Sequence, residues 1–278
     1  MKKLSHFIIF LNAINFFAQQ NYTGFIGKYP IELVADVHTG VTINAFYVYT
    51  AYDEPIKLEG NFQNGELTFF EKDVIGKKSA RMTFQKFDSE SDSVHGVWMD
   101  LKTNKKLNIT LAKQNDLSIG IIQATAIDDK YFRIVTDYSN VSAIKIYQKK
   151  TDKLLQKFDV NCRYWGLHTF NLGDFNFDGI TDFSIFESSF AGPNTSSLYF
   201  LCDPKTKTFF ESHITGVSLE FDQKTKRITE TNQCCAGSII TKSSYKLVKN
   251  EMVLVKEQCF RWSEKKQELV ERELIECQ

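Results

Sequence analysis

The chain has 278 residues, with 34 basic and 34 acidic side chains and a formal net charge of zero. This balance argues against nucleic acid as a partner, because nucleic-acid-binding surfaces carry an excess of Lys and Arg. It also gives no electrostatic reason to expect binding to a membrane surface. The length is sufficient for two ordinary domains with cores of their own.

The N-terminus has the order of a secretory signal peptide. Lys2 and Lys3 give a positive start, Phe7 to Phe17 form a short apolar run, and the small Ala18 precedes the polar Gln19. The run is shorter than the roughly 20 residues needed to cross a bilayer, and no later segment is long and apolar enough. The alternative is an amphipathic or buried first strand. We expect a periplasmic or secreted protein without a transmembrane segment in the mature chain.

The rest of the chain has the pattern of β-strands. Leu107, Ile109 and Leu111 alternate with polar residues, which is the period of a half-buried strand. Asn64-Gly65 is the best hairpin turn, because both positions tolerate positive φ. The stretch from Ser263 to Glu276 is compatible with either a helix or a strand. We predict an all-β fold with two antiparallel domains, a small N-terminal barrel or sandwich and a larger C-terminal sandwich or propeller-like domain.

The predicted domain boundary falls near Lys113 to Leu117. Residues 1–18 would be the signal peptide, and residues 19–114 a β domain of about eight strands without cysteine. Residues 115–278 would form the second domain, which contains all the cysteines.

An even number of cysteines in an exported chain indicates disulfides. The six are Cys162, Cys202, Cys234, Cys235, Cys259 and Cys277. They allow about 15 pairings, and the sequence does not choose among them. Metal binding is the weaker interpretation, since there is no Cys-x-x-Cys motif. Cys234 and Cys235 are adjacent, and a bond between them would be strained, so we expect each to pair elsewhere or one to stay free.

One loop has the spacing of a calcium-binding segment. Oxygen-bearing side chains recur at every second position, Gly179 can take the positive φ of a sharp turn, and one main-chain carbonyl completes the set. The expected ligands are Asp174, Asn176, Asp178, Ile180 through its carbonyl, and Asp182. Calcium takes six to eight hard oxygen ligands, and this spacing wraps a chain around one ion.

The flanks of this loop separate it from the EF-hand. An EF-hand needs an acid at its twelfth position, where this chain has Ile185. Strand-like segments precede and follow the loop, so we expect a calcium site between strands. The alternative is an ion-free turn, but three carboxylates within nine residues repel one another unless a cation neutralises them. The expected dissociation constant is about 10⁻⁴ to 10⁻³ M, as in other extracellular modules.

The segment Gly173 to Asp182, followed by Ala191-Gly192-Pro193 and the strand Leu198 to Leu201, resembles an FG-GAP repeat of integrin-type propellers. The ligand positions of that family match the five residues named above. Two departures are Leu172, where the family has Phe, and the single occurrence of the loop. A propeller built from repeats of this loop is therefore not expected.

A closer resemblance covers roughly Asp159 to Val255 and is to bacterial periplasmic proteins with a single loop of this kind. Some of these resemble lysozyme inhibitors that act as immunity proteins against peptidoglycan-cleaving effectors. The N-terminal part is similar to a β domain common in exported proteins of Bacteroidetes-like bacteria, at Phe25 to Ile31, Tyr47 to Tyr49 and Pro55 to Gly60. The resemblance implies an inhibitor or immunity protein whose partner is a lysozyme-like peptidoglycan hydrolase.

No motif for catalysis stands out. The sequence has no His-x-x-x-His or His-Glu-x-x-His zinc motif, no Gly-x-Ser-x-Gly elbow and no phosphate-binding glycine loop. We therefore expect a protein that is not an enzyme. The alternative is a hydrolase with a carboxylate pair that no motif marks, for which Glu187 and Glu211 are candidates.

The segment after the calcium-like loop is the best candidate for partner binding. It is small, polar and flexible in composition, and loops held by a rigid sheet often carry function. The candidate contact residues are Ser188, Phe190, Gly192, Asn194 and Tyr199. The alternative is an ordinary hairpin with Tyr199 in the core. A second functional hypothesis is a cell-envelope module, structural or binding cell-wall glycan through aromatics such as Tyr47, Tyr49 and Trp98.

Overall fold

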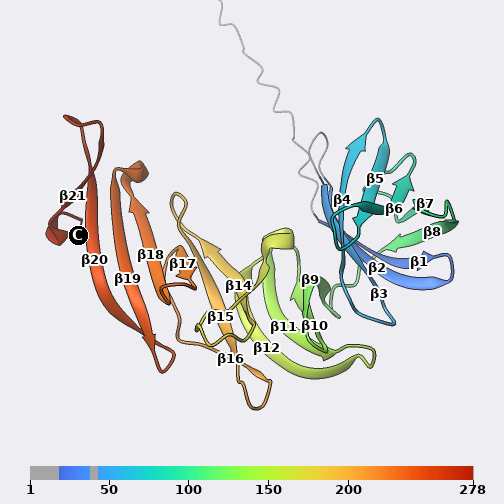
Figure 1. Ribbon diagram of the computed structural model, residues 1–278. Helices are drawn as coiled ribbons and strands as arrows, with labels where there is room; N and C mark the ends of the chain where they lie inside the picture. Colours follow the sequence, from blue (N-terminus) through green and yellow to red (C-terminus); the bar gives the residue numbers. More distant parts are fainter. Residues whose placement is uncertain (1–18, 38–42, 278) are drawn as a thin grey trace, which may run out of the picture.

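The computed structural model describes residues 19–37 and 43–277 (Figure 1). The predicted signal peptide, residues 1–18, lies outside the described residues. The described part is all-β, as predicted, with three short 3-10 helices between or after its strands. No helix in this part is long and apolar enough to cross a membrane.

The N-terminal domain is a closed antiparallel barrel. Its strands are β1 (Gln20–Ile26), β2 (Tyr29–Asp36), β3 (Ile43–Tyr49), β4 (Ile56–Gln63), β5 (Glu66–Lys72), β6 (Lys78–Phe84), β7 (Ser93–Asp100) and β8 (Lys106–Lys113). The barrel closes because β8 pairs with β1. Alternate residues such as Ile109 and Leu111 point into the barrel core. Asn64 and Gly65 form the β4–β5 turn with φ of 52° and 77°, which fits a type I′ hairpin.

Three antiparallel sheets follow the barrel, each with its strands in sequence order. The first contains β9 (Ile121–Ile127), β10 (Lys130–Thr136), β11 (Asn140–Gln148) and β12 (Lys153–Arg163). The second contains β13 (Phe170–Gly173), β14 (Asp182–Ser189), β15 (Thr195–Cys202) and β16 (Phe209–Glu211). The third contains β17 (Leu219–Asp222), β18 (Arg227–Cys234), β19 (Ile239–Val248), β20 (Glu251–Ser263) and β21 (Glu268–Arg272).

The sheets follow one another away from the barrel, in the manner of successive propeller blades (Figure 1). The 3-10 helices lie between or after strands as η1 (Gly166–His168), η2 (Cys235–Gly237) and η3 (Leu274–Cys277). The C-terminal stretch left open by the sequence is thus a strand, β21, followed by a 3-10 turn. The stretch is a strand because its main chain pairs with β20, for example at Trp262 and Leu269, and a helix could not make this pairing.

Two apolar cores join the sheets to each other and to the barrel. The first combines Val34, Phe46 and Val48 from the outer face of the barrel with side chains of the first and second sheets. The second lies between the second and third sheets and contains Phe175, Phe177, Tyr199, Leu201, Ile214 and Ile228. The barrel ends with β8 at Lys113, and the first sheet begins with β9 at Ile121. The predicted domain boundary, between residues 114 and 115, falls in this interval.

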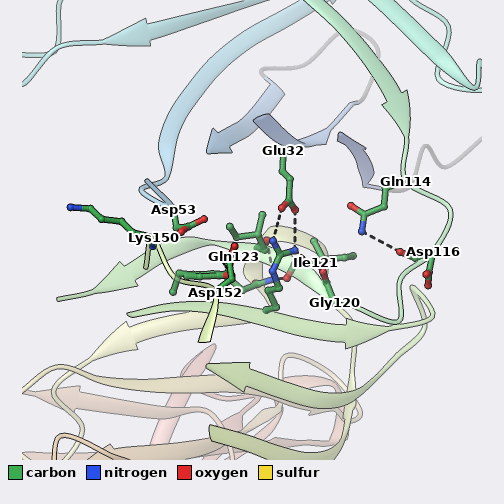
Figure 2. A network of polar contacts seen from close by, with 12 residues as sticks. Glu32, Asp53, Gln114, Asp116, Gly120, Ile121, Gln123, Lys150 and Asp152 are labelled. Carbon is green, nitrogen blue, oxygen red and sulfur yellow. Dashed lines mark hydrogen bonds and ion pairs between the residues drawn. The ribbon is translucent and has the colours of Figure 1, made fainter. Parts of the chain in front are cut away.

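Polar contacts cross the same junction (Figure 2). Glu32 on β2 points from the barrel toward the first sheet, where Arg133 on β10 donates to both of its carboxylate oxygens. The main-chain N–H of Lys150 donates to Asp53 at 2.9 Å. The barrel and the first sheet are therefore joined by buried apolar and ionic contacts together.

The cysteines form one disulfide, Cys259–Cys277, with the Cα atoms 5.8 Å apart. Cys162 and Cys202 are free and buried, and Cys234 and Cys235 are free and exposed. The sequence predicted that Cys234 and Cys235 would each pair elsewhere or that one of them would stay free. In the structure both are free. The reason is that the fold places the two buried thiols in the first apolar core, away from this exposed turn.

Candidate calcium loop and the hairpin beyond it

The calcium-like loop connects β13 to β14. Gly173 at the end of β13 pairs with Asp182 at the start of β14, so the two ends of the loop are neighbours across the ladder. The seven residues between Asp174 and Asp182 close a compact turn. This position makes the geometry of the loop depend on the pairing of the two strands that it joins.

Two buried aromatic residues anchor the loop. Phe175 and Phe177 alternate with the polar residues and point into the second core. The ring of Phe175 lies 4.9 Å from that of Tyr199 and 4.9 Å from that of Phe221, centroid to centroid. Phe177 has a φ of 64°, a conformation uncommon for a bulky residue. The alternation leaves Asp174, Asn176 and Asp178 on the outer side of the turn.

The polar side chains of the loop bind its own backbone. Asp174 accepts hydrogen bonds from the N–H of Asp178 at 3.1 Å and of Gly179 at 2.9 Å. The amide oxygen of Asn176 accepts from Asp178 N–H at 3.2 Å, and Asp178 accepts from Ile180 N–H at 2.8 Å. Gly179 has the positive φ, 85°, that the sequence predicted for this position. These bonds wind the chain into a tight spiral.

Asp182 occupies the inner end of the spiral and has no exposed surface. Its carboxylate accepts from the N–H of Phe175 at 2.9 Å and of Cys202 at 2.8 Å, which connects the loop to β15. Burial raises the pKa of Asp182 to about 6, the charges of Asp178 and Asp174 add to this effect, and the two N–H donors oppose it. A cation beside this carboxyl would favour its ionised form.

The five predicted ligands lie in one loop, but the carboxylates of Asp174, Asp178 and Asp182 accept hydrogen bonds from different main-chain N–H groups and do not converge on one point. In residues 19–37 and 43–277, no group of three or more His, Cys, Asp and Glu side chains is close enough to hold a metal ion. A calcium ion would therefore rely on the Asn176 amide and the Ile180 carbonyl as well as on carboxylates. Each N–H bond uses one lone pair of an oxygen and leaves another for a cation. The donor set fits calcium provided that the carboxylates converge on binding.

The third sheet also holds the loop, a feature the sequence did not reveal. Gln223 donates its side-chain amide to the carbonyl of Asp174 at 2.6 Å, and Lys226 donates to the carbonyl of Phe177 at 3.1 Å. Both residues follow β17 in the turn to β18. The pairing of these distant segments is set by the packing of the second core, and no local pattern signals it.

The hairpin between β14 and β15 is the predicted partner-binding segment. Its turn is closed by a bond from Phe190 N–H to the Asn194 carbonyl at 2.8 Å, and Gly192 supplies a φ of 71°. The side chain of Phe190 is 53 % exposed. Ser188 lies at the end of β14 and is half-buried. The hairpin therefore presents one large apolar side chain to solvent.

Two of the predicted contact residues are buried. Tyr199 is only 6 % exposed and packs against the aromatic rings of the second core, the alternative that the sequence left open. Asn194 is also 6 % exposed. Its side-chain amide donates to the Gln233 carbonyl at 2.8 Å and to Asn232 at 3.1 Å, and its oxygen accepts from Gln233 N–H at 3.0 Å. Asn194 thus fastens the hairpin to β18.

A polar hollow of about 300 Å³ lies beside the contact between Asn194 and β18. Asn232 both lines this hollow and accepts a hydrogen bond from Asn194. Its lining residues are Glu230, Asn232, Thr241, Ser243, Tyr245, Glu257, Leu274 and Cys277. Glu230 is held by the Tyr245 hydroxyl at 2.7 Å and by Val217 N–H at 2.8 Å. The disulfide to Cys259 keeps the C-terminal turn at the edge of the hollow. Sequence reasoning did not find this hollow, because it combines outward side chains of three strands.

The fold and these contacts define an all-β protein that joins a closed barrel to a row of antiparallel sheets. No protein-family model matches the chain, and no curated protein matches it. Among solved structures, a Xanthomonas type IV secretion system related protein is 15 % identical over 90 % of this chain and 98 % of its own, with a TM-score of 0.27. The β-propeller domain of the Trilobed protease from Pyrococcus furiosus is 10 % identical over 92 % of this chain and 72 % of its own, with a TM-score of 0.21.

Proposed function

We propose that this protein is an exported, calcium-binding, non-catalytic protein that inhibits a lysozyme-like peptidoglycan hydrolase through the hairpin at residues 188–194. The observation that carries the proposal is the position of β14. This strand begins at Asp182 of the calcium-like loop and ends at the hairpin that exposes Phe190. Calcium would have a structural role, with Asp174, Asn176, Asp178, Ile180 and Asp182 as its ligands.

The support for a binding role is the combination of a fixed base with an exposed apolar tip. Asn194 holds one side of the hairpin to β18 through three hydrogen bonds. Phe190 stands at the tip, 53 % exposed, and a preorganised aromatic side chain costs little entropy when a partner covers it. The class of the target comes from the sequence resemblance to lysozyme-inhibitor-type immunity proteins.

The test compares two exposed phenylalanines in an inhibition assay. The hydrolase is a purified lysozyme-like enzyme acting on peptidoglycan, and each protein is titrated against it. We expect the wild type to inhibit at about equal molar amounts and Phe190→Ala to weaken inhibition at least tenfold. The matched control is Phe210→Ala on β16, because Phe210 is also exposed, at 41 %, but lies outside the hairpin. Equal inhibition by the two variants would contradict the proposed contact surface.

A second candidate function is binding of cell-wall glycan, and the polar hollow beside the hairpin favours it. Its lining offers hydroxyl, amide and carboxylate groups in a space of about 300 Å³, a composition that suits sugar hydroxyls. Co-sedimentation with purified sacculi tests this function. Binding that is lost in Asn232→Ala and Tyr245→Phe, without inhibition of a hydrolase, would favour the glycan over the enzyme as partner.

A further inference from the structure

Two adjacent thiols lie where β18 ends and the turn to β19 begins: Cys234 is extended, and Cys235 opens a turn of uncommon backbone conformation. Cys235, Ala236 and Gly237 have φ of 58°, 56° and 83° in succession. In the part of the chain that the structure describes, consecutive non-glycine residues with positive φ occur elsewhere only at Lys249 and Asn250. That pair forms a hairpin turn, where such angles are common. At η2 the positive φ values place Cys235 in a strained surface turn, directly after the extended Cys234.

The two thiols belong to adjacent residues, and both are open to reagents. The neighbouring Cys235 thiol raises the pKa of Cys234. Both residues are exposed, whereas Cys162 and Cys202 are buried. Thiol exchange requires access to the attacking sulfur, so these two are the free thiols that an external disulfide can reach first.

The turn is connected directly to the hairpin at residues 188–194 through Asn194. Cys234 follows Gln233, whose N–H and carbonyl both bind the side-chain amide group of Asn194. A change in the backbone at residue 234 therefore acts on the two bonds that hold Asn194. No other residue intervenes along the chain between the thiol pair and this attachment.

We propose that Cys234 and Cys235 form a reversible vicinal dithiol site that reacts with small or protein disulfides, and that its state determines how firmly Asn194 holds the hairpin. One thiolate attacks the incoming disulfide and displaces a first thiol. The neighbouring thiolate then closes the Cys234–Cys235 bond and displaces a second thiol. The pair loses two electrons and two protons, and the incoming disulfide leaves as two thiols. This inference holds whatever partner the hairpin binds.

The geometry explains why such a bond would be labile. Adjacent Cα atoms are about 3.8 Å apart across a trans peptide, and disulfides usually join Cα atoms about 4.4 to 6.8 Å apart. A bond closed at this spacing is strained and is therefore reduced more readily than a relaxed one. The Cys259–Cys277 disulfide, at 5.8 Å, lies within the usual range. The ring would also constrain the turn and draw Gln233 away from its present position.

The first measurement is mass spectrometry of the full-length protein equilibrated in buffers of reduced and oxidised glutathione, then alkylated and digested. We expect the peptide with Cys234 and Cys235 to lose two hydrogen atoms in oxidising buffer. It should regain them under milder reduction than Cys259–Cys277 requires. A retained glutathione adduct, or a bond from either residue to Cys162 or Cys202, would overturn the assignment of a vicinal pair.

The second measurement is amide hydrogen exchange at residues 190–194 in both states. We expect oxidation to raise the exchange rate several-fold in the wild type and to leave the Cys234→Ser/Cys235→Ser variant unchanged. Asn194→Ala should exchange rapidly in both states and shows the size of the effect when the attachment is lost. Equal exchange in the oxidised and reduced wild type would refute the link between the thiol pair and the hairpin.

Discussion

The ion pair between Glu32 and Arg133 offers a direct test of how the barrel is joined to the first sheet. Their side chains are 12 % and 11 % exposed. Arg133 donates to both carboxylate oxygens of Glu32, at 2.5 and 3.0 Å, and to the carbonyl of Gly120 at 3.0 Å (Figure 2). Burial alone would lower the pKa of Arg133, but the hydrogen bonds and charge of Glu32 outweigh it and raise that pKa.

The substitution Arg133→Met keeps most of the side-chain volume and removes the charge. It leaves Glu32 buried without a partner, which costs about 3 to 5 kcal/mol in comparable pairs. The double variant Glu32→Gln/Arg133→Met leaves no uncompensated charge, so we expect it to be more stable than Arg133→Met by about 2 kcal/mol or more. The exposed pair Lys72–Glu59, with side chains 39 % and 56 % accessible, is the control. Lys72→Met should cost at most about 1 kcal/mol.

Urea unfolding of the wild type, Arg133→Met, Glu32→Gln, the double variant and the control Lys72→Met supplies the free energies for a double-mutant cycle. Fluorescence of the tryptophans follows the transition. If Arg133→Met costs no more than Lys72→Met, the pair is solvated and the junction depends on the apolar core alone. If the double variant is no more stable than Arg133→Met, the loss arises from packing or from the Gly120 carbonyl and not from a stranded charge.

Three further predictions concern the second sheet. Calcium at 5 mM should stabilise the protein by about 2 kcal/mol for a dissociation constant of about 10⁻⁴ M, and Asp178→Ala should abolish this response in thermal unfolding with and without chelator. Without calcium, the raised pKa of Asp182, about 6 against 3.8, means that stability falls as pH rises from about 4 to about 6 and then levels off. Asp182→Asn should flatten that interval in unfolding measured across pH, and an unchanged slope would contradict the assignment. Asn194→Ala should lower stability by about 1 to 3 kcal/mol and speed protease cleavage at the hairpin, because Gln233 loses both partners.

Local sequence patterns predicted the features that local physics determines. Alternation in β8 placed Ile109 and Leu111 on the inner face of a barrel strand, because a strand has one buried side. Asn64-Gly65 formed the expected turn for the same kind of reason, since its positive φ values are a property of the two residues themselves. The spiral from Asp174 to Asp182 is local as well, because its bonds join residues at most seven positions apart.

Local sequence patterns could not predict the contacts between distant strands. The sequence around Tyr199 on β15 would be the same whether its side chain faced solvent or a neighbouring sheet. Tyr199 is buried because the third sheet packs against the second. The amide of Asn194 finds Gln233 through a separation of 39 residues. The junction ion pair joins residues 101 positions apart. Disulfide pairing follows the same rule, since six cysteines allow many pairings and the fold selects by distance.

The second sheet owes its fixed position to ties at both ends of β14 and β15. At one end, the Asp182 carboxylate binds the N–H of Cys202 across the two strands. At the other, Asn194 binds Gln233 of the third sheet. Gln223, in the turn that follows β17 of that sheet, holds the calcium-like loop at the first end by donating to the Asp174 carbonyl. The hairpin and the calcium-like loop are therefore each fastened to the third sheet by separate hydrogen bonds. Because the ties are separate, calcium would act on the loop and the thiol turn on the hairpin, and the two influences would meet only through the rigid strands between them.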